Sequence, residues 1–273
     1  MKHIITIVLI AFIVIGCGKK TETVSKDTKE VKQEVKIQDS LSYEVKNFKK
    51  TYKDCKDSDE KCSYLKVSYP NFSGYSAAEI NKVVDAYIVD SIFTIEGNAS
   101  NKNLEGLAAT FFADYDSVMK DASPDFPVVY ALDVNSNVVF NKPAALSVSI
   151  DYYINTGGAH PNSFVRNFVF NPKTGKQVKL SDLFNSGFED KLNKLIDKKY
   201  REYRNLKDTD RLDGEKGYLF DNFIKFNDNF ILTKEGIYFY YNNYEIAAYA
   251  VGPTELKFTY KELEEILKPG YKL

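Results

Sequence analysis

The alternation of apolar and polar residues predicts a β-hairpin at the start of the globular part. The stretches SYEVKNFKKTY (42–52) and CSYLKVSYP (62–70) carry aromatic and β-branched residues in rough alternation, which is typical of strands. The loop between them contains lysines and four acidic residues without the spacing of a calcium-binding loop: Asp54, Asp57, Asp59 and Glu60. We therefore expect two paired strands joined by a solvated tip.

Two stretches with helical spacing follow this hairpin. In residues 76–93, apolar side chains recur on one helical face, and Ser76 with Glu79 matches the capping-box pattern. Residues 103–121 place Leu104, Leu107 and Phe111 at the same helical spacing. We predict two amphipathic helices whose apolar stripes belong to the core.

From Pro127 onward the pattern returns to strands. Residues 128–140, 145–155 and 163–171 have strand character, and the first either turns at 135–137 or runs through as one long strand. The later predicted elements are a helix (188–205), a hairpin (229–242) turning at 234–236, a strand (255–260) and a short helix (261–268). Strands follow strands and helices are segregated, so the predicted class is α+β: antiparallel sheets with helices packed on one side, in two intimately packed subdomains.

The first residues of the chain predict a secreted, lipid-anchored protein. The apolar run from Ile4 to Ile15 is shorter than the ~20 residues that a membrane span needs. It ends in VIGC, which resembles the bacterial lipobox, so we expect residues 1–17 to be a leader with Cys17 as the lipidation site. An uncleaved anchor would give the same outward topology. Since only three residues precede the apolar run, we expect no cytoplasmic domain.

Residues 18–40 contain no aromatic side chain and mixed charge, which predicts a flexible tether between the membrane and the globular part. We expect a location in the cell envelope, with the outer membrane or the periplasmic side favoured because Gly18 is not an aspartate. The formal net charge is −1 and no basic stripe stands out, so a nucleic-acid partner is not expected. No cofactor or metal site is predicted.

The other two cysteines, Cys55 and Cys62, enclose the loop of the first hairpin. An isolated pair at this spacing outside the cytoplasm predicts a disulfide. Metal binding would require further soft ligands nearby, and the sequence offers none.

The loop TGGAHPN (156–162) contains His160, which is the only histidine outside the predicted leader. Gly157 and Gly158 permit a tight bend and Asn162 closes the loop, so His160 either shapes this turn, contacts a ligand, or acts in catalysis. Catalysis would require an orienting partner and a nucleophile or water. The structural reading is favoured, and the loop remains a candidate ligand-binding site.

A second candidate site is the aromatic stretch YYNNYEIAAYAVGPTE (240–255). Tyrosines in such loops supply contact area at low entropic cost, which nominates Tyr244 and Tyr249. Glu245 either binds a cationic partner or accepts backbone hydrogen bonds. The alternative is that these side chains pack as a lid on the core.

Three segments together resemble one known family. They are YYINTGGAHPN with FNPKTGKQVKLSDLF after it, the stretch from Asn229 to about Leu263, and the hairpin and helices from Tyr43 to about Met119. They are similar to the extracellular modules of the PdaC/RsiV-type family, which accompany a peptidoglycan N-deacetylase and form the lysozyme-sensing part of an anti-sigma factor. The resemblance implies a PdaC-like α+β module over 41–125 and an RsiV-like α+β module over 126–273.

The resemblance implies binding rather than catalysis. The deacetylase chemistry of the family belongs to a separate domain with an Asp and paired His ligands, and this chain has no second histidine in its globular part. We therefore expect a non-enzymatic envelope module whose ligand is a lysozyme-like protein or peptidoglycan. The alternatives are a peptidoglycan-directed hydrolase that uses His160, and a purely structural lipoprotein.

Overall fold

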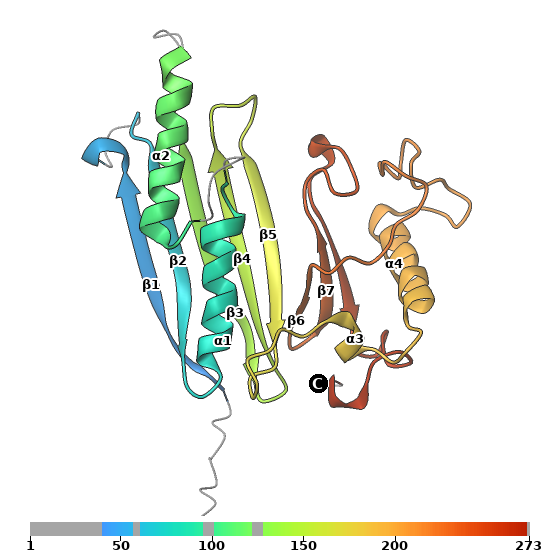
Figure 1. Ribbon diagram of the computed structural model, residues 1–273. Coiled ribbons are helices and arrows are strands. Elements are labelled where there is room, and N and C mark those ends of the chain that lie inside the picture. The colour runs from blue at the N-terminus through green and yellow to red at the C-terminus, as the bar shows by residue number, and fades with distance from the viewer. Residues whose placement is uncertain (1–39, 57–60, 95–100, 122–127, 272–273) are drawn as a thin grey trace, which may run out of the picture. The chain divides into compact units, whose positions relative to one another are not determined.

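Two β-sheets organise the chain, as the computed structural model shows for residues 40–56, 61–94, 101–121 and 128–271 (Figure 1). The predicted leader, all but the last residue of the predicted tether, and the acidic side chains of the first hairpin loop lie outside the described residues. In the described part of the chain, no helix is both long and apolar enough to span a membrane.

The first sheet has five strands in the order β1-β2-β3-β4-β5. Their bounds are β1 Ser42–Thr51, β2 Tyr64–Ser73, β3 Ala131–Lys142, β4 Ala145–Asn155 and β5 Asn162–Phe170. The predicted strands are confirmed, and β3 runs through without a turn at 135–137. The α+β class with antiparallel sheet is confirmed, with one departure in this sheet: β2 and β3 pair in parallel.

Two helices cover one face of this sheet (Figure 1): α1, Ala77–Ala86, and α2, Leu104–Asp121. Ile80, Val84 and Ile88 follow at four-residue steps and are buried, and they pack with the sheet in one apolar cluster. A π-helical turn, Tyr87–Ser91, continues α1. The predicted capping box is absent, because the Ser76 hydroxyl donates to the carbonyl oxygen of Pro172 instead.

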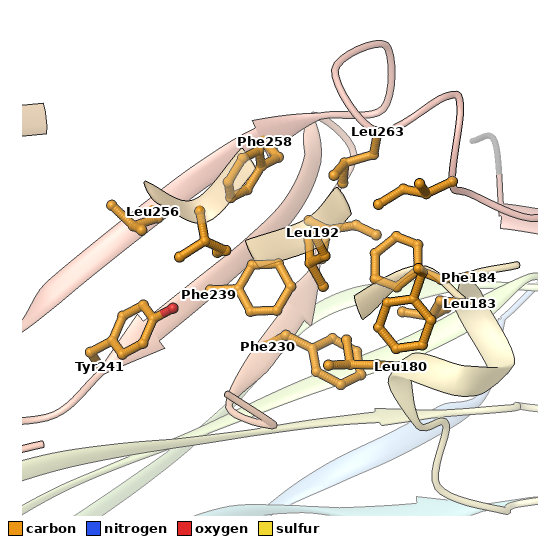
Figure 2. Packing of buried hydrophobic residues seen from close by; sticks show 14 of the residues in the cluster. Leu180, Leu183, Phe184, Leu192, Phe230, Phe239, Tyr241, Leu256, Phe258 and Leu263 are labelled. Carbon is orange, nitrogen blue, oxygen red and sulfur yellow. The ribbon is translucent and has the colours of Figure 1, made fainter. Parts of the chain in front are cut away.

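The second sheet has three antiparallel strands, β6 Phe230–Leu232, β7 Gly236–Tyr241 and β8 Thr254–Thr259. The long helix α4, Glu189–Arg204, packs on it after the short helix α3, Leu180–Leu183. Figure 2 shows Leu192 of α4 among Phe239, Phe258 and Leu263. The predicted helix over 261–268 is wrong: these residues form turns that bury Leu263, Ile266 and Leu267.

The two cores meet at β4 and β5, which confirms two intimately packed subdomains. Ala145 and Val169 belong to the apolar cluster of the second sheet. Their chain neighbours Leu146 and Phe168 belong to the cluster under α1 and α2. Successive strand residues point to opposite faces, so each of these strands contributes one face to each core.

The Cys55–Cys62 disulfide is confirmed, with the two Cα atoms 5.7 Å apart. It joins the ends of β1 and β2, which pair in register from Ser42 with Ser73 to Thr51 with Tyr64. The module boundary expected at residues 125 and 126 falls between α2 and β3, whereas the first sheet continues to Phe170.

Candidate functional site

The two loops predicted as candidate sites lie against each other. The loop between β4 and β5 carries His160, and the loop between β7 and β8 carries Tyr244 and Tyr249. The His160 ring stacks on Tyr249 with the ring centroids 3.8 Å apart, and the Tyr244 centroid lies 5.6 Å from that of Tyr249. We call these three residues the junction cluster, because they join the two subdomains.

Both nitrogens of the His160 ring have hydrogen-bond partners in the described structure. Nδ1 lies 3.0 Å from the carbonyl oxygen of Pro161, and Nε2 lies 3.2 Å from the Tyr244 hydroxyl. The Tyr249 hydroxyl donates to the same Pro161 oxygen at 2.9 Å. Neither of these partners is a carboxylate. A backbone carbonyl and a tyrosine hydroxyl fix the orientation of the His160 ring.

Gly157 makes the close approach of the β4–β5 loop to Val128 possible. Gly157 has a φ of +77°, and a Cβ there would lie 2.3 Å from a Val128 methyl carbon. Its N–H donates to the side-chain oxygen of Asn155. A Cβ at Gly158 would lie 4.0 Å from the carbonyl oxygen of His160, an ordinary van der Waals distance, so the structure does not require a glycine there. In the described structure, the side-chain oxygen of Asn162 is buried and has no hydrogen-bond partner.

Glu245 organises the turn that presents Tyr244. Its two carboxylate oxygens accept from the backbone N–H of Asn242 and from the side-chain amide of Asn227. The reading that Glu245 accepts backbone hydrogen bonds therefore has direct geometric support. Tyr244 sits in this turn at a φ of +64°, a region that costs most residues roughly 1–2 kcal/mol, and its side chain is 53% exposed.

Asparagine side chains occupy the outer edge of β5 beside the junction cluster. The Asn229 amide oxygen accepts from the N–H of Asn167, and its nitrogen donates to the carbonyl oxygen of Val165. Asn242 makes the equivalent pair with the N–H and C=O of Val165. The free edge of an outer strand exposes backbone N–H and C=O groups that can pair with another strand. The two asparagine amides bond these groups on β5, as a sixth strand would.

An ion pair lies next to these amides. The guanidinium of Arg166 on β5 donates to both carboxylate oxygens of Asp228 at 3.0 and 3.2 Å. The Arg166 guanidinium lowers the pKa of Asp228 below its ordinary value. The pair joins the two subdomains at the point where β5 meets the segment before β6.

A cleft of about 480 Å³ opens beside the junction cluster. Its lining comes from the π-helical turn after α1, from β4 and β5, and from the C-terminal loops: Tyr87, Tyr152, Phe164, Arg166, Asp228 and Glu245 are among its residues. Tyr152 and Phe164 stack with centroids 5.2 Å apart. Burial raises the pKa of both Tyr87 and Tyr152, so both phenols remain neutral donors near pH 7.

This arrangement supports binding through stacked rings, amides and charges. Among the described residues, no group of three or more His, Cys, Asp and Glu side chains could hold a metal ion. Asp151, a carboxyl on β4 nine residues before His160, accepts from Asn137 and Ser149, whereas the His160 ring contacts Pro161 and Tyr244. Burial raises the pKa of Asp151.

Sequence reasoning found the rings of the site but missed its other parts. The two loops appeared as separate candidates, and their contact joins residues 84 positions apart. Arg166, Asp228 and Asn229 were not nominated, because hydrophobic periodicity marks core positions and says nothing of polar residues at a sheet edge. The runs NDN at 227–229 and NN at 242–243 are a usable signal, since asparagine amides can replace a strand at a sheet edge.

An α+β protein with a disulfide and a junction of this kind fits an envelope-associated, extracytoplasmic module. Comparison with family models shows which one: residues 55–163 match the model described as "Deacetylase PdaC", and residues 181–261 match that of the protein of unknown function DUF3298. Residues 55–163 are therefore similar to a PdaC-type module and residues 181–261 to a DUF3298 module, which confirms the resemblance to the PdaC/RsiV-type family.

Two solved structures share the fold. A DUF3298 family protein from Pseudomonas aeruginosa PAO1 has a TM-score of 0.64 at 18% identity, covering 85% of this chain and 96% of that one. A DUF3298 family member from Bacteroides fragilis NCTC 9343 has a TM-score of 0.62 at 19% identity, with the same coverage. No curated protein matches the chain.

Proposed function

We propose that this chain is a lipid-anchored binding module of the bacterial cell envelope whose ligand is a lysozyme-type protein. Cys17 would carry the lipid, and the tether would let the globular part stand away from the membrane, since a coil of its length reaches on the order of 25–30 Å. The proposed ligand follows from the family resemblance, and the junction cluster is the proposed contact surface.

The junction cluster is the observation that supports this proposal most. Tyr244 is half exposed. Its backbone has a positive φ, which is unfavourable for a residue with a side chain. It is held there by His160 and by the Glu245 turn. A tyrosine fixed in advance loses little conformational entropy when it contacts a partner, so this geometry suits recognition.

The charges around the junction cluster suit a basic partner. The carboxylates of Asp228 and Glu245 lie at the rim of the cleft, and Arg166 is the cation beside them. Two negative groups against one positive group leave a small local excess of negative charge. Lysozyme-type enzymes are generally basic, so long-range attraction would favour their approach to this surface.

Peptidoglycan is the second candidate ligand, because of the cleft. Stacked Tyr152 and Phe164 offer flat apolar faces, and Arg166 and Glu245 offer polar groups in the same lining. Aromatic walls with a few placed polar groups are typical of small-ligand sites. In this version the cleft holds a segment of the glycan or its peptide.

A hydrolase that uses His160 has less support in the geometry. General-base catalysis needs an orienting partner and an accessible substrate position, whereas the partners of the His160 ring are a backbone carbonyl and a tyrosine hydroxyl. The word deacetylase describes the matched family. We do not extend that activity to this chain, because the described residues contain one histidine and no metal-holding group.

Calorimetric titration of residues 19–273 with lysozyme tests the proposal, with soluble peptidoglycan fragments as the comparison ligand. We expect saturable lysozyme binding with a Kd of about 1 μM or tighter, the range of a specific protein complex. Tyr244→Ala should weaken it at least about tenfold, because exposed tyrosines at an interface centre often carry more than 1 kcal/mol.

Matched variants separate contact from folding. His160→Phe retains a ring that can stack on Tyr249, so binding should fall less than in His160→Ala. Tyr75→Ala removes a tyrosine that is 95% exposed and far along the chain from both loops, and should bind as the unmodified protein does. Heat with peptidoglycan alone would favour the second ligand, and no heat with either would exclude both.

A further inference from the structure

The end of the first sheet at which the chain enters β1 carries a second exposed surface. β1 begins at Ser42 beside Ser73, the last residue of β2, and β3 turns into β4 between Lys142 and Ala145. Figure 1 shows these ends together, at the end of the sheet opposite the β4–β5 loop. Four segments make up this surface, which we call the tether end: residues 40–42, 73–76, 141–144 and 171–176.

Hydrogen bonds join these segments to one another. The Asn141 side chain accepts from the N–H of Leu41 and donates to its carbonyl oxygen, which ties the chain entry to the β3–β4 turn. The Ser76 hydroxyl donates to the carbonyl oxygen of Pro172, which ties the β2–α1 turn to the turn after β5. A Cβ at Gly74 would lie 3.4 Å from a methyl carbon of Leu41. The four segments therefore form one connected surface.

The turn after β5 is held in place by its own backbone and by the β2–α1 turn. Gly175 has a φ of +71°, and a Cβ there would lie 2.6 Å from the carbonyl oxygen of Ser76. The N–H of Gly175 donates to the carbonyl oxygen of Asn171, and the N–H of Asn171 donates to that of Lys176. The side chains of Lys173 and Lys176 are exposed, so both extend from a backbone that is fixed in the free protein.

The tether end is basic. The charged side chains of its four segments are three exposed lysines, Lys142, Lys173 and Lys176, and no acid. Among the described residues, none of the three is in an ion pair. Each acid that flanks the segments in sequence has a lysine two or three residues further out: Asp39 with Lys36, Glu44 with Lys46, and Glu79 with Lys82. The excess of three positive charges therefore remains in a wider count.

An exposed tyrosine stands among these lysines. Tyr75 is 95% exposed, more than any other large hydrophobic residue of the described chain. It lies between Gly74, which approaches Leu41, and Ser76, which bonds Pro172. Tyrosine is enriched at membrane–water interfaces, where its ring sits at the level of the headgroups. Lysines next to anionic lipids are attracted to the same region, so this combination suits a lipid surface.

The point at which the tether joins the globular part selects the partner. The chain enters this surface at Ser40 and Leu41, so the end of the sheet with the lysines is also the end nearest to the anchor along the chain. A lipid at Cys17 would keep the globular part within the reach of the tether. A flexible link of that kind gives an effective concentration in the millimolar range, so weak contacts suffice to hold this end on a membrane.

We propose that the tether end docks on anionic lipid headgroups, with its three lysines next to the phosphates and the Tyr75 ring at the headgroup level. This inference rests on the lipid anchor of the proposed function, and it does not depend on the lysozyme-type ligand. Docking would turn the β4–β5 loop, at the opposite end of the sheet, away from the membrane. The junction cluster would then face an arriving partner. The tether alone permits every orientation, and the contact selects this one.

A single tryptophan tests the orientation. The chain has no tryptophan, so Tyr75→Trp introduces the only one into the full-length protein, which is reconstituted into vesicles. In vesicles that contain phosphatidylglycerol, the emission should shift to shorter wavelength and be quenched by brominated lipids. In vesicles of phosphatidylcholine alone, both changes should be clearly smaller, because the attraction between the lysines and anionic headgroups is lost.

Tyr153→Trp is the matched position on the same sheet. Tyr153 is 37% exposed and lies eight residues along β4 from Ala145, a distance of about 25 Å at the usual strand rise. Its tryptophan should show neither the shift nor the dependence on anionic lipid, because docking holds this part of the sheet away from the membrane. Equal quenching at the two positions would mean that the protein has no fixed orientation and would overturn the proposal.

Replacing the lysines tests the charge without the lipid anchor. Residues 19–273, which lack Cys17, should sediment with phosphatidylglycerol vesicles at low salt. Lys142→Gln/Lys173→Gln/Lys176→Gln should weaken this binding roughly a hundredfold, since each lysine near an anionic surface contributes about fivefold. The matched control removes the same charge from exposed positions of α4, in Lys191→Gln/Lys194→Gln/Lys198→Gln. It should weaken binding far less, because charges more than about 10 Å from the surface are screened at 0.1 M salt.

The outcomes separate docking from the proposed function. Thermal unfolding should show that each variant folds, since every replaced residue is exposed or half-buried at the surface. Lysozyme titration judges the proposed ligand independently, because none of these substitutions lies in the junction cluster. Absent lysozyme binding together with lipid-dependent quenching at position 75 would support docking and exclude that ligand. Docking is overturned if the protein ignores both kinds of vesicle, or if the two triple variants bind equally well.

Discussion

The two outer strands of the five-stranded sheet protect their unpaired edges in different ways. β1 is outermost on one side and is exposed along most of its length, with Lys46, Lys49 and Lys50 on it. β5 is outermost on the other side, and Asn229 and Asn242 of the second subdomain occupy its edge. One edge is guarded by charge and the other by side-chain amides.

The comparison shows why the candidate site lies where it does. Lysine charges on β1 discourage pairing with other strands. Capping β5 from the second subdomain brings the β7–β8 loop against the β4–β5 loop, and this contact creates the junction cluster and the cleft. Covering an edge strand has thus produced the surface that we propose as the binding site.

Removing the Asn229 amide should have the largest effect on stability. Asn229 is buried, and Asn229→Ala leaves the N–H of Asn167 without its partner, while the carbonyl oxygen of Val165 loses one of its two donors and keeps the Asn242 amide. An unsatisfied buried group costs about 1–3 kcal/mol and a lost hydrogen bond about 0.5–1.5 kcal/mol, so we expect a loss of roughly 2–4 kcal/mol in the free energy of unfolding, measured by urea denaturation.

The matched control lies between β1 and β2. The amide of Asn71 reaches the carboxylate of Glu44 at 3.5 Å on the exposed side of the sheet. Asn71→Ala should change the free energy of unfolding by less than about 0.5 kcal/mol, as exposed substitutions usually do. Equal losses in the two variants would contradict the difference between the edges.

The disulfide should rank second, because β1 has a single neighbouring strand. Cys55 and Cys62 close a loop with a sequence separation of 7, and a cross-link of that length stabilises by about 2–2.5 kcal/mol in the chain-entropy account. We expect Cys55→Ser/Cys62→Ser to lose roughly that amount in urea denaturation. A loss as large as that of Asn229→Ala would mean that the β1 edge matters as much as the β5 edge.

The local elements of the fold could be predicted from sequence, because they depend on neighbouring residues. The alternation in 145–155 gave β4 with its observed bounds, and the helical spacing in 188–205 gave α4, which spans Glu189–Arg204. The Cys55–Cys62 bond followed from spacing and compartment. In each case the determining residues lie within a few positions of one another.

The failures share the opposite property. The parallel pairing of β2 with β3 joins strands separated by both helices. The Ser76 hydroxyl found Pro172, 96 residues away, in place of the predicted cap. Residues 261–268 were predicted as a helix. They form turns instead, in which Leu267 pairs with Phe184 through a β-bridge and the apolar side chains join the second core. Distant partners decided each outcome.

The Arg166–Asp228 pair should contribute less, and in a pH-dependent way. The Arg166 guanidinium lowers the pKa of Asp228 in the folded protein, so below the ordinary carboxyl pKa of about 3.9 the unfolded chain takes up this proton first. The contribution is therefore present at neutral pH and is lost as the pH falls through 4 and below. The Asp228 side chain is 81% exposed, so we expect at most about 1 kcal/mol.

Urea denaturation between pH 3 and pH 6 measures this contribution. Asp228→Asn should be less stable than the unmodified protein at pH 6, and the difference should shrink towards pH 3. Glu255 provides the control, because it pairs with Lys257 on the same strand and away from the β5 edge. A difference for Asp228→Asn that grows as the pH falls would contradict the assignment of the lowered pKa to Arg166.

The smallest effect on stability, and the most informative one for the β1 edge, should come from its lysines. Lys46→Val should leave the free energy of unfolding within about 0.5 kcal/mol, because the residue is exposed. It should instead raise self-association, because a valine removes the charge that discourages edge pairing. Light scattering over a concentration series measures this, with Lys198→Val on the exposed face of α4 as the control. If the two valine variants associate equally, general hydrophobicity explains the effect; if only the β1 variant does, charge guards that edge as the amides guard β5.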